Sequence, residues 1–218
     1  MKKFELTSEF VTFLGKKLFR IKALVSFGDV KEGELGGLVE KEENLDQSGN
    51  AWVSGDARVY GDARVYGNAW VSGDAWVSGN AWVSGDAWVS GDAWVSGDAR
   101  VYGDARVYGN AWVSGDARVY GDAWVSGDAR VYGDAWVSGD ARVQNCRDYS
   151  ATSCFGSENR TTTFFRTKDG GISVRCGCFY GTLAEFREKV KERHGGRRLA
   201  KEYLMLADLM EFRLSKDE

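Results

Sequence analysis

The chain has 218 residues and a formal net charge of −3, from 29 Lys and Arg against 32 Asp and Glu. That length is enough for one or two domains with a buried core, and a charge so close to balance argues against a general polyanion binder. The composition includes 28 Gly, no Pro and a single His. It excludes proline-rich linkers and collagen-like segments, as well as any site that needs two imidazoles from one chain.

The N-terminus and the cysteines bear on the cellular location. The first ten residues begin with Lys2 and Lys3 but lack the apolar segment of a secretory signal. No run of about 18 apolar residues is present, so no membrane span is expected. The four cysteines, Cys146, Cys154, Cys176 and Cys178, lie in the last third of the chain. Without secretion they are more typical of reduced thiols than of a disulfide framework, and we expect a cytoplasmic protein.

Residues 1–48 are expected to form an N-terminal cap that contains a β-hairpin. Two apolar segments, residues 10–13 and 18–21, flank a turn with a glycine. Further on, Val39 and Leu45 keep a spacing of six residues, but the register slips before the regular repeat begins. We interpret this segment as a degenerate first coil of the repeat.

From Gly49 to Gln144 the chain consists of sixteen copies of one six-residue unit, without an insertion. The unit reads Gly-(Asp/Asn)-Ala-(Trp/Arg)-Val-(Ser/Tyr), and it contains all nine Trp of the protein. Trp is followed by Ser at the last position and Arg by Tyr, except that the last copy ends in Gln144. Such a fixed period indicates a repeat architecture.

Alternation within the unit predicts which side chains face inwards. Successive side chains of an extended strand point to opposite faces, so Ala and Val are expected inside and Trp or Arg outside. Gly-Asp and Gly-Asn tolerate a positive φ and mark corners. Three units would close one triangular coil, and sixteen units give about five coils stacked about 4.8 Å apart. The alternative is a narrow antiparallel sheet in which each Gly-Asp forms a hairpin turn.

The repeat resembles the hexapeptide pattern of left-handed parallel β-helix proteins. Segment 59–63, Val-Tyr-Gly-Asp-Ala, has Val with Ala four residues later, and the resemblance covers all sixteen copies. The left-handed coil is an implication of that resemblance, since general rules favour right-handed crossovers. Residues 27–46 are also similar to the N-terminal region of hexapeptide-repeat proteins that are common in phages and prophages.

Residues 145–218 are expected to form a separate module with the order ββαα. Segments 161–165 and 172–176 are typical of strands. A capping box of Thr182 and Glu185 predicts a helix that ends at the following glycine pair. An apolar stripe then predicts a second helix over residues 198–213. The first part of this region resembles a C-terminal module of phage-encoded proteins, which supplies a context but no chemistry.

These segments together define the expected fold. It is mainly β, with a triangular left-handed parallel β-helix of about five coils over residues 49–144. An N-terminal β cap (residues 1–48) precedes the β-helix, and a small C-terminal α+β domain (residues 145–218) follows it. The two caps cover the first and last coils, whose strand edges would otherwise be open.

No catalytic residue and no cofactor is predicted. The resemblance implies that an acyltransferase of this class would use a His as general base near a loop that breaks the helix, and the repeat contains neither. His194 is the sole candidate, and it lies beside Gly195 at a predicted helix C-terminus, where the helix dipole favours an imidazolium. The carbonic anhydrases of this fold need three His ligands, which one His per chain does not supply.

No metal site is predicted either. Cys176 and Cys178 are separated by one residue, whereas structural zinc sites place about two to four residues between paired ligands. Two Cys at alternate positions of one strand share a face, which is consistent with burial as small apolar groups. Ice-binding β-helices use ladders of Thr, and this repeat contains no Thr.

Stacking every third copy sorts the outward residues into three ladders. The first face carries Trp52, Trp70, Trp88, Arg106, Trp124 and Arg142, the second Arg58, Trp76, Trp94, Trp112 and Arg130, and the third Arg64, Trp82, Arg100, Arg118 and Trp136. Aromatic and cation–π contacts between neighbours would stabilise the coils by about 0.5–1 kcal/mol each. Arg is also expected to neutralise the stacked Asp of the corners.

The outward Trp and Arg are the strongest indication of binding. Nine outward Trp form too large an apolar surface for an isolated monomer, and interfaces favour Trp, Tyr and Arg. We predict a homo-oligomer, with a trimer favoured by analogy with the family, and a host protein or small-molecule ligand as a further partner. Nucleic acid is disfavoured, because the repeat has twelve Asp against seven Arg. The residues predicted to bind are Trp70, Trp76, Trp88, Trp94, Trp112, Arg100 and Arg118.

The sequence therefore favours a non-catalytic binding or scaffold protein, encoded by a phage or prophage and located in the cytoplasm of the bacterial host. Its rigid β-helix would oligomerise and present the C-terminal module, to sequester a host protein or a small signalling molecule. The alternative is an acyltransferase-like hexapeptide-repeat enzyme with a site between subunits.

Overall fold

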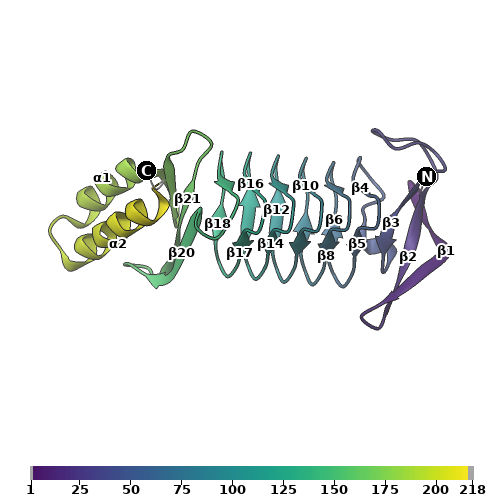
Figure 1. Cartoon of the computed structure of the whole chain (residues 1–218), viewed down its shortest axis with the longest axis horizontal. Helices are drawn as coiled ribbons and strands as arrows, with labels where there is room; N and C mark the ends of the chain where they lie inside the picture. Colours follow the sequence, from purple (N-terminus) through teal and green to yellow (C-terminus); the bar gives the residue numbers. More distant parts are fainter. Residues whose placement is uncertain (1, 216–218) are drawn as a thin grey trace.

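The computed structural model describes residues 2–215 of an elongated molecule (Figure 1). A solenoid of short strands fills the middle, with a strand hairpin at the N-terminal end and a sheet with two helices at the C-terminal end. The two termini lie at opposite ends. None of the helices in the described part of the chain is both long and apolar enough to cross a membrane.

The solenoid consists of three parallel sheets, which form the three sides of each turn. Each strand pairs with the strand 18 residues further along, as Trp94 pairs with Trp112 and Val95 with Val113. Pairing at this offset confirms the predicted parallel β-helix architecture and contradicts the antiparallel alternative. The first face contains β4 (Trp52–Val53), β7 (Trp70–Val71), β10 (Trp88–Val89), β13 (Arg106–Val107), β16 (Trp124–Val125) and β19 (Arg142–Val143). The second contains β5 (Arg58–Val59), β8 (Trp76–Val77), β11 (Trp94–Val95), β14 (Trp112–Val113) and β17 (Arg130–Val131), and the third β6 (Arg64–Val65), β9 (Trp82–Val83), β12 (Arg100–Tyr102), β15 (Arg118–Tyr120) and β18 (Trp136–Val137).

The Ala and Val of every unit form the core of the solenoid. All of these side chains in the repeat are at most 1% exposed, and they belong to one apolar cluster that extends into both caps. Burying one Val side chain contributes about 1.5–3 kcal/mol. Backbone hydrogen bonds link each turn to the next, as the Trp94 N–H donates to the carbonyl oxygen of Ala111 at 2.8 Å. The predicted inward positions of Ala and Val are thus confirmed.

The N-terminal sheet continues the second face of the solenoid. β1 (Phe4–Phe13) and β2 (Lys16–Ala23) form an antiparallel hairpin, and β2 pairs with β3 (Leu35–Val39). The turn between β1 and β2 uses Leu14 and Gly15, both with positive φ, as tight hairpin turns do. β3 in turn pairs in parallel with β5. One eight-stranded sheet therefore runs from the hairpin to β17.

An additional turn precedes the regular repeat. Val39 pairs with Val59 and Leu45 with Val65, an offset of 20 residues instead of 18. The two extra residues account for the slip in register that the sequence shows before the repeat. A short 3₁₀ helix, η1 (Glu42–Asn44), forms one corner of this turn. The solenoid consequently makes about six turns, whereas the count of sixteen units predicts about five.

An antiparallel sheet of four strands covers the last turn of the solenoid. The strands are β20 (Tyr149–Phe155), β21 (Arg160–Arg166), β22 (Ile172–Cys176) and β23 (Phe179–Thr182), in that order across the sheet. The predicted order ββαα is therefore wrong, because two further strands flank the expected pair. β20 reads Tyr-Ser-Ala-Thr-Ser-Cys-Phe, and its small polar residues hide the alternation of a strand. β23 is only four residues long and runs directly into a helix.

The C-terminal sheet separates two apolar cores. Tyr149 and Phe165 belong to the core of the solenoid, whereas Phe164 and Val174 belong to a second core with the helices. The helices are α1 (Leu183–His194) and α2 (Arg198–Leu214), and α1 begins with the predicted capping box at Thr182. This sheet therefore ends the solenoid on one side and supports a small helical layer on the other.

We predict that the Gly79→Ala variant is less stable than the wild type by about 1–3 kcal/mol. Gly79 has a φ of 67°, and an added Cβ would lie 2.9 Å from the backbone nitrogen and oxygen of Gly97 in the next turn. Urea unfolding measures the loss. The matched control is Gly196→Ala, since no atom lies within 4 Å of its added Cβ. An equal loss of stability in both variants would contradict the claim that the next turn of the solenoid requires glycine at this corner.

The ammonium group of Lys3 caps the open edge of the first turns. Its Nζ donates to the carbonyl oxygens of Ala51 at 2.9 Å and Ser48 at 3.3 Å, and the residue is 4% exposed. Burial lowers the pKa of Lys3 from 10.5 to about 8. Between these two values the unfolded chain binds more protons than the folded one, so the free energy of unfolding rises with pH in this window.

We therefore predict that the stability advantage of the wild type over Lys3→Met increases between pH 8 and pH 10.5, by up to about 3 kcal/mol. Urea unfolding at a series of pH values measures both proteins. Lys31→Met changes an exposed lysine of the same cap and should show a difference from the wild type that varies little with pH. A pH-independent difference for Lys3→Met would refute the assignment.

Candidate functional site

The seven residues predicted to bind are spread over all three faces of the solenoid. Trp70 and Trp88 lie on the first face, Trp76, Trp94 and Trp112 on the second, and Arg100 and Arg118 on the third. They do not form one site. Among the five tryptophans, only the three of the second face have successive rings in direct contact.

The second face carries a continuous row of aromatic rings, which we call the aromatic ladder: Phe13, Trp76, Trp94 and Trp112. The ring centroids of Trp76 and Trp94 are 5.1 Å apart, and those of Trp94 and Trp112 are 4.9 Å apart, both edge-to-face. Phe13 of the N-terminal hairpin extends the row, 4.6 Å from Trp76. Such pairs contribute about 0.5–1.5 kcal/mol each beyond their buried area. The sequence alone did not indicate Phe13, because it comes from outside the repeat.

Two arginines close the ends of the aromatic ladder. The Arg58 guanidinium lies 4.6 Å from the ring centroid of Phe13, and that of Arg130 lies 5.2 Å from Trp112. No ionisable side chain separates the three tryptophans, which pair directly with one another in the sheet. Trp112 remains 42% exposed. The face is therefore apolar along its middle and cationic at both ends.

The first and third faces carry arginines among their tryptophans. On the first face Trp52, Trp70 and Trp88 come in succession, but Trp52 is buried. Arg106 lies between two tryptophans of the first face, 5.7 Å from Trp88 and 5.2 Å from Trp124. On the third face, Arg100 lies 5.1 Å from Trp82. Each of these guanidinium groups interrupts the apolar surface and covers part of the neighbouring tryptophan ring. The continuous apolar surface on these two faces is therefore shorter than on the second face.

Trp52 does not contribute to the outer surface, although the sequence places it on the first ladder. It is 0% exposed, and its ring packs edge-to-face on Phe27 of the N-terminal cap at 5.4 Å. The prediction of nine solvent-facing tryptophans is therefore wrong for this residue. The cap that ends the solenoid also covers the side of its first turn.

The arginines of the repeat do not neutralise the corner aspartates. Among residues 2–215 no ion pair joins an Arg of the repeat to an Asp of the repeat; Asp56 pairs instead with Arg20 of the N-terminal cap, at 3.3 Å. Six of the seven guanidinium groups of the repeat lie over tryptophan rings instead. Corner contacts form where Asn precedes Asp in a column, as the Asn68 side-chain amide donates to Asp86 at 3.1 Å. The expected neutralisation by the arginines of the repeat is therefore wrong.

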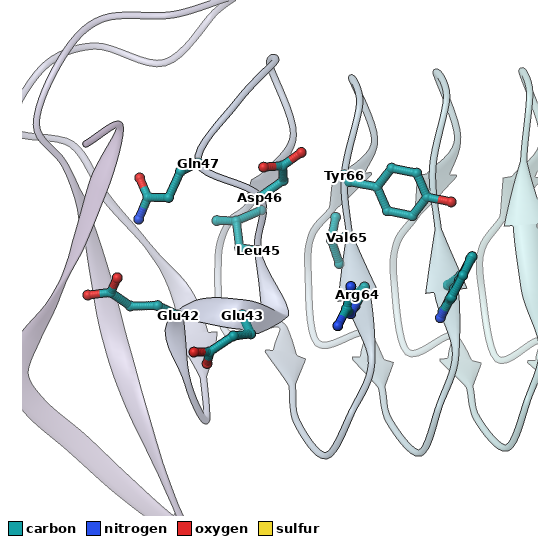
Figure 2. Close-up of a pocket in the computed structure, with 9 residues that line it drawn as sticks. Glu42, Glu43, Leu45, Asp46, Gln47, Arg64, Val65 and Tyr66 are labelled. Atoms are coloured by element: carbon teal, nitrogen blue, oxygen red, sulfur yellow. The ribbon is translucent and has the colours of Figure 1, made fainter. Parts of the chain in front are cut away.

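A groove with a volume of about 640 Å³ lies where the N-terminal cap meets the third face. Figure 2 shows Glu42 and Glu43 on the side of the cap and Arg64 and Tyr66 on the adjoining turn. Glu42 forms an ion pair with Lys2 at 2.8 Å. Asp46, also in the groove, accepts from the Ser48 backbone N–H at 3.0 Å, and this bond holds the pKa of Asp46 below its usual range. Glu42 and Asp46 therefore stabilise the cap through these contacts.

The residues considered for catalysis or metal binding lie in the C-terminal part of the chain. His194 is the last residue of α1 and stacks on Tyr203, with a centroid distance of 5.6 Å. All four cysteines are free. Cys178 is exposed in the turn after β22, where Gly177 has a φ of 58°, so the predicted shared buried face with Cys176 is wrong. No group of three His, Cys, Asp or Glu within residues 2–215 is arranged to hold a metal ion.

Comparison with known proteins supports the repeat architecture. Residues 57–73, 63–79, 99–115, 113–127 and 123–139 match the family described as YdcK Beta solenoid repeat. All of these segments lie within the three faces of the solenoid. No curated protein matches the chain. The similarity therefore supports a repeat β-solenoid protein.

Proposed function

We propose that the protein is a non-catalytic scaffold that self-associates through the aromatic ladder of its second face. The supporting observation is the uninterrupted contact of Phe13, Trp76, Trp94 and Trp112 on one regular sheet. Trp112 is exposed, and Phe13, Trp76 and Trp94 are half-buried. Contiguous, partly exposed aromatic surface with a cationic border is typical of protein interfaces. In such an assembly the solenoids would act as rigid rods that hold the C-terminal domains of the associated copies at fixed positions.

The hairpin adds to the apolar surface next to the ladder. Leu14, at its tip, is 72% exposed, and Val11 in β1 is 37% exposed. β1 and β2 belong to the same sheet as the ladder. A second copy of this chain is a suitable occupant, because each copy offers apolar rings together with the guanidinium groups of Arg58 and Arg130, which stack favourably on aromatic faces.

The finer features of the proposal come from resemblance. A trimer and an origin in a phage or prophage follow from the likeness to hexapeptide-repeat proteins. A bacterial host is implied by the same likeness, and the four free cysteines are consistent with its cytoplasm. Capture of a host protein or a small signalling molecule fits that phage context. The similarity to a β-solenoid repeat is compatible with these features. Self-association is independent of them and can be tested separately.

We predict that Trp94→Arg converts the oligomer to a monomer of 24.1 kDa. The substitution places a charge in the middle of the aromatic ladder, where like charges from two copies would meet. It should change the fold little, because Arg occupies the same position in seven other units. Sedimentation velocity and thermal unfolding measure the two effects.

Trp88→Arg is the matched control, since it makes the same change on the first face. The oligomer should persist in this variant. Dissociation by Trp88→Arg but not by Trp94→Arg would assign the interface to the first face and contradict the proposal. Turnover of an acyl-CoA donor that disappears in His194→Ala would instead favour the acyltransferase alternative.

A further inference from the structure

A second cavity lies inside the C-terminal domain, away from the faces of the solenoid. Its volume is about 430 Å³, and it opens between α1, α2 and the turn that joins β22 to β23. Phe179, Phe186, Val190 and Tyr203 form its apolar floor. The ring of Phe186 contacts Phe179 at 5.6 Å and Tyr203 at 5.9 Å. Fixed aromatic walls of this kind are typical of small-molecule sites.

The rim of this cavity, which we call the module pocket, is cationic. Arg160 and Arg193 line it, together with Lys189 and Glu158. Lys189 forms an ion pair with Glu192 at 2.7 Å. Within residues 2–215, neither arginine side chain has a hydrogen bond or an ion pair. Two guanidinium groups therefore remain available beside an apolar floor.

Three other arginines of the same domain have acidic partners, whereas Arg160 and Arg193, like Arg147 and Arg197, have none among residues 2–215. Arg187 pairs with Asp208 at 2.6 Å and with Glu211 at 2.8 Å. Arg166 lies 3.3 Å from Asp148, and Arg198 lies 2.9 Å from Glu202. A guanidinium group carries five donors and prefers a planar anion such as a carboxylate or phosphate. In the module pocket no protein group meets that preference.

Helix electrostatics explain only part of this charge. Basic residues in the last turn of α1, including Arg193, are expected because they offset the helix dipole. Arg160 comes from the sheet, at the first position of β21, so the dipole does not account for it. Its Nη1 lies 3.2 Å from the position that a Cβ of Gly177 would occupy. Because glycine has no side chain, the guanidinium of Arg160 can lie close to the β22–β23 turn at position 177.

We propose that the module pocket binds a small molecule that carries an aromatic ring and an anionic group. The ring would pack on Phe179 and Phe186, and the anion would accept hydrogen bonds from Arg160 and Arg193. Charge-assisted hydrogen bonds to a carboxylate, phosphate or sulfonate are the strongest that arginine forms. This inference goes beyond the scaffold function and does not depend on self-association, because no residue of the aromatic ladder lines the pocket.

The test compares two fluorescent probes on the full-length protein. Anilinonaphthalene sulfonate has an aromatic body and an anion, and phenylnaphthylamine has the same body without the charge. We expect Arg160→Gln and Arg193→Gln each to weaken binding of the sulfonate by about fivefold or more, with little effect on the neutral probe. Both arginines are exposed, so the variants should fold normally.

Two further variants and one chemical readout locate the binding site. Lys201→Gln removes a positive charge from α2 outside the pocket, and Phe212→Glu disrupts the exposed apolar side of α2; both should bind the sulfonate normally. Saturating sulfonate should slow alkylation of Cys178, which lines the pocket, but not alkylation of Cys146. An equal loss in Lys201→Gln, a loss in Phe212→Glu, or unprotected Cys178 would overturn the proposal.

Discussion

Backbone hydrogen bonding between turns at a fixed offset of 18 residues is the constraint on which the rest of the structure depends. The strands are only two or three residues long, so no single strand pair is stable alone. Stability comes from stacking identical turns, each of which buries its Ala and Val. The glycine corners make the stacking possible, since they bring successive backbones closer than a Cβ would allow.

This constraint separates the inner and outer positions of the unit. Ala, Val and Gly are fixed in all sixteen copies, whereas the outward position alternates between Trp and Arg. Both residues are compatible with the turn, because aromatic and cation–π contacts join neighbours on every face. The choice between Trp and Arg therefore determines whether the outer surface is apolar or cationic at that position, and it leaves the fold unchanged. The first and second faces each have three tryptophans in succession, but only those of the second face have their rings in direct contact, and Trp52 of the first face is buried against Phe27. The proposed interface lies on the second face for this reason.

The sequence predicts most of the solenoid because every unit repeats the same information. Inward Ala and Val, outward Trp and Arg, and the grouping into three ladders all follow from a period of six and from strand alternation. The helices were equally predictable: the capping box at Thr182 and the apolar stripe of α2 are local signals. Features that depend on contact between distant segments were not predictable. Phe13 joins the aromatic ladder and Phe27 buries Trp52 through packing across the chain.

The candidate sites also depend on contacts between distant segments, which the sequence does not predict. The pattern indicates which residue types face outwards, but only the structure shows which faces keep a continuous apolar surface. The module pocket combines residues from β21, the β22–β23 turn, α1 and α2, and no short motif marks that combination. Its two unpaired arginines become evident once the partners of Arg166, Arg187 and Arg198 are known.

One 18-residue turn is the structural unit of the solenoid. A pair of deletions tests it most directly, with thermal unfolding followed by circular dichroism. Removing residues 85–102 deletes one complete turn and keeps all three faces in register, so this variant should still unfold cooperatively near the wild-type temperature. Removing residues 85–93 deletes half a turn and brings outward residues into the core, so it should abolish the transition. Equal loss of folding in both deletions would contradict the claim.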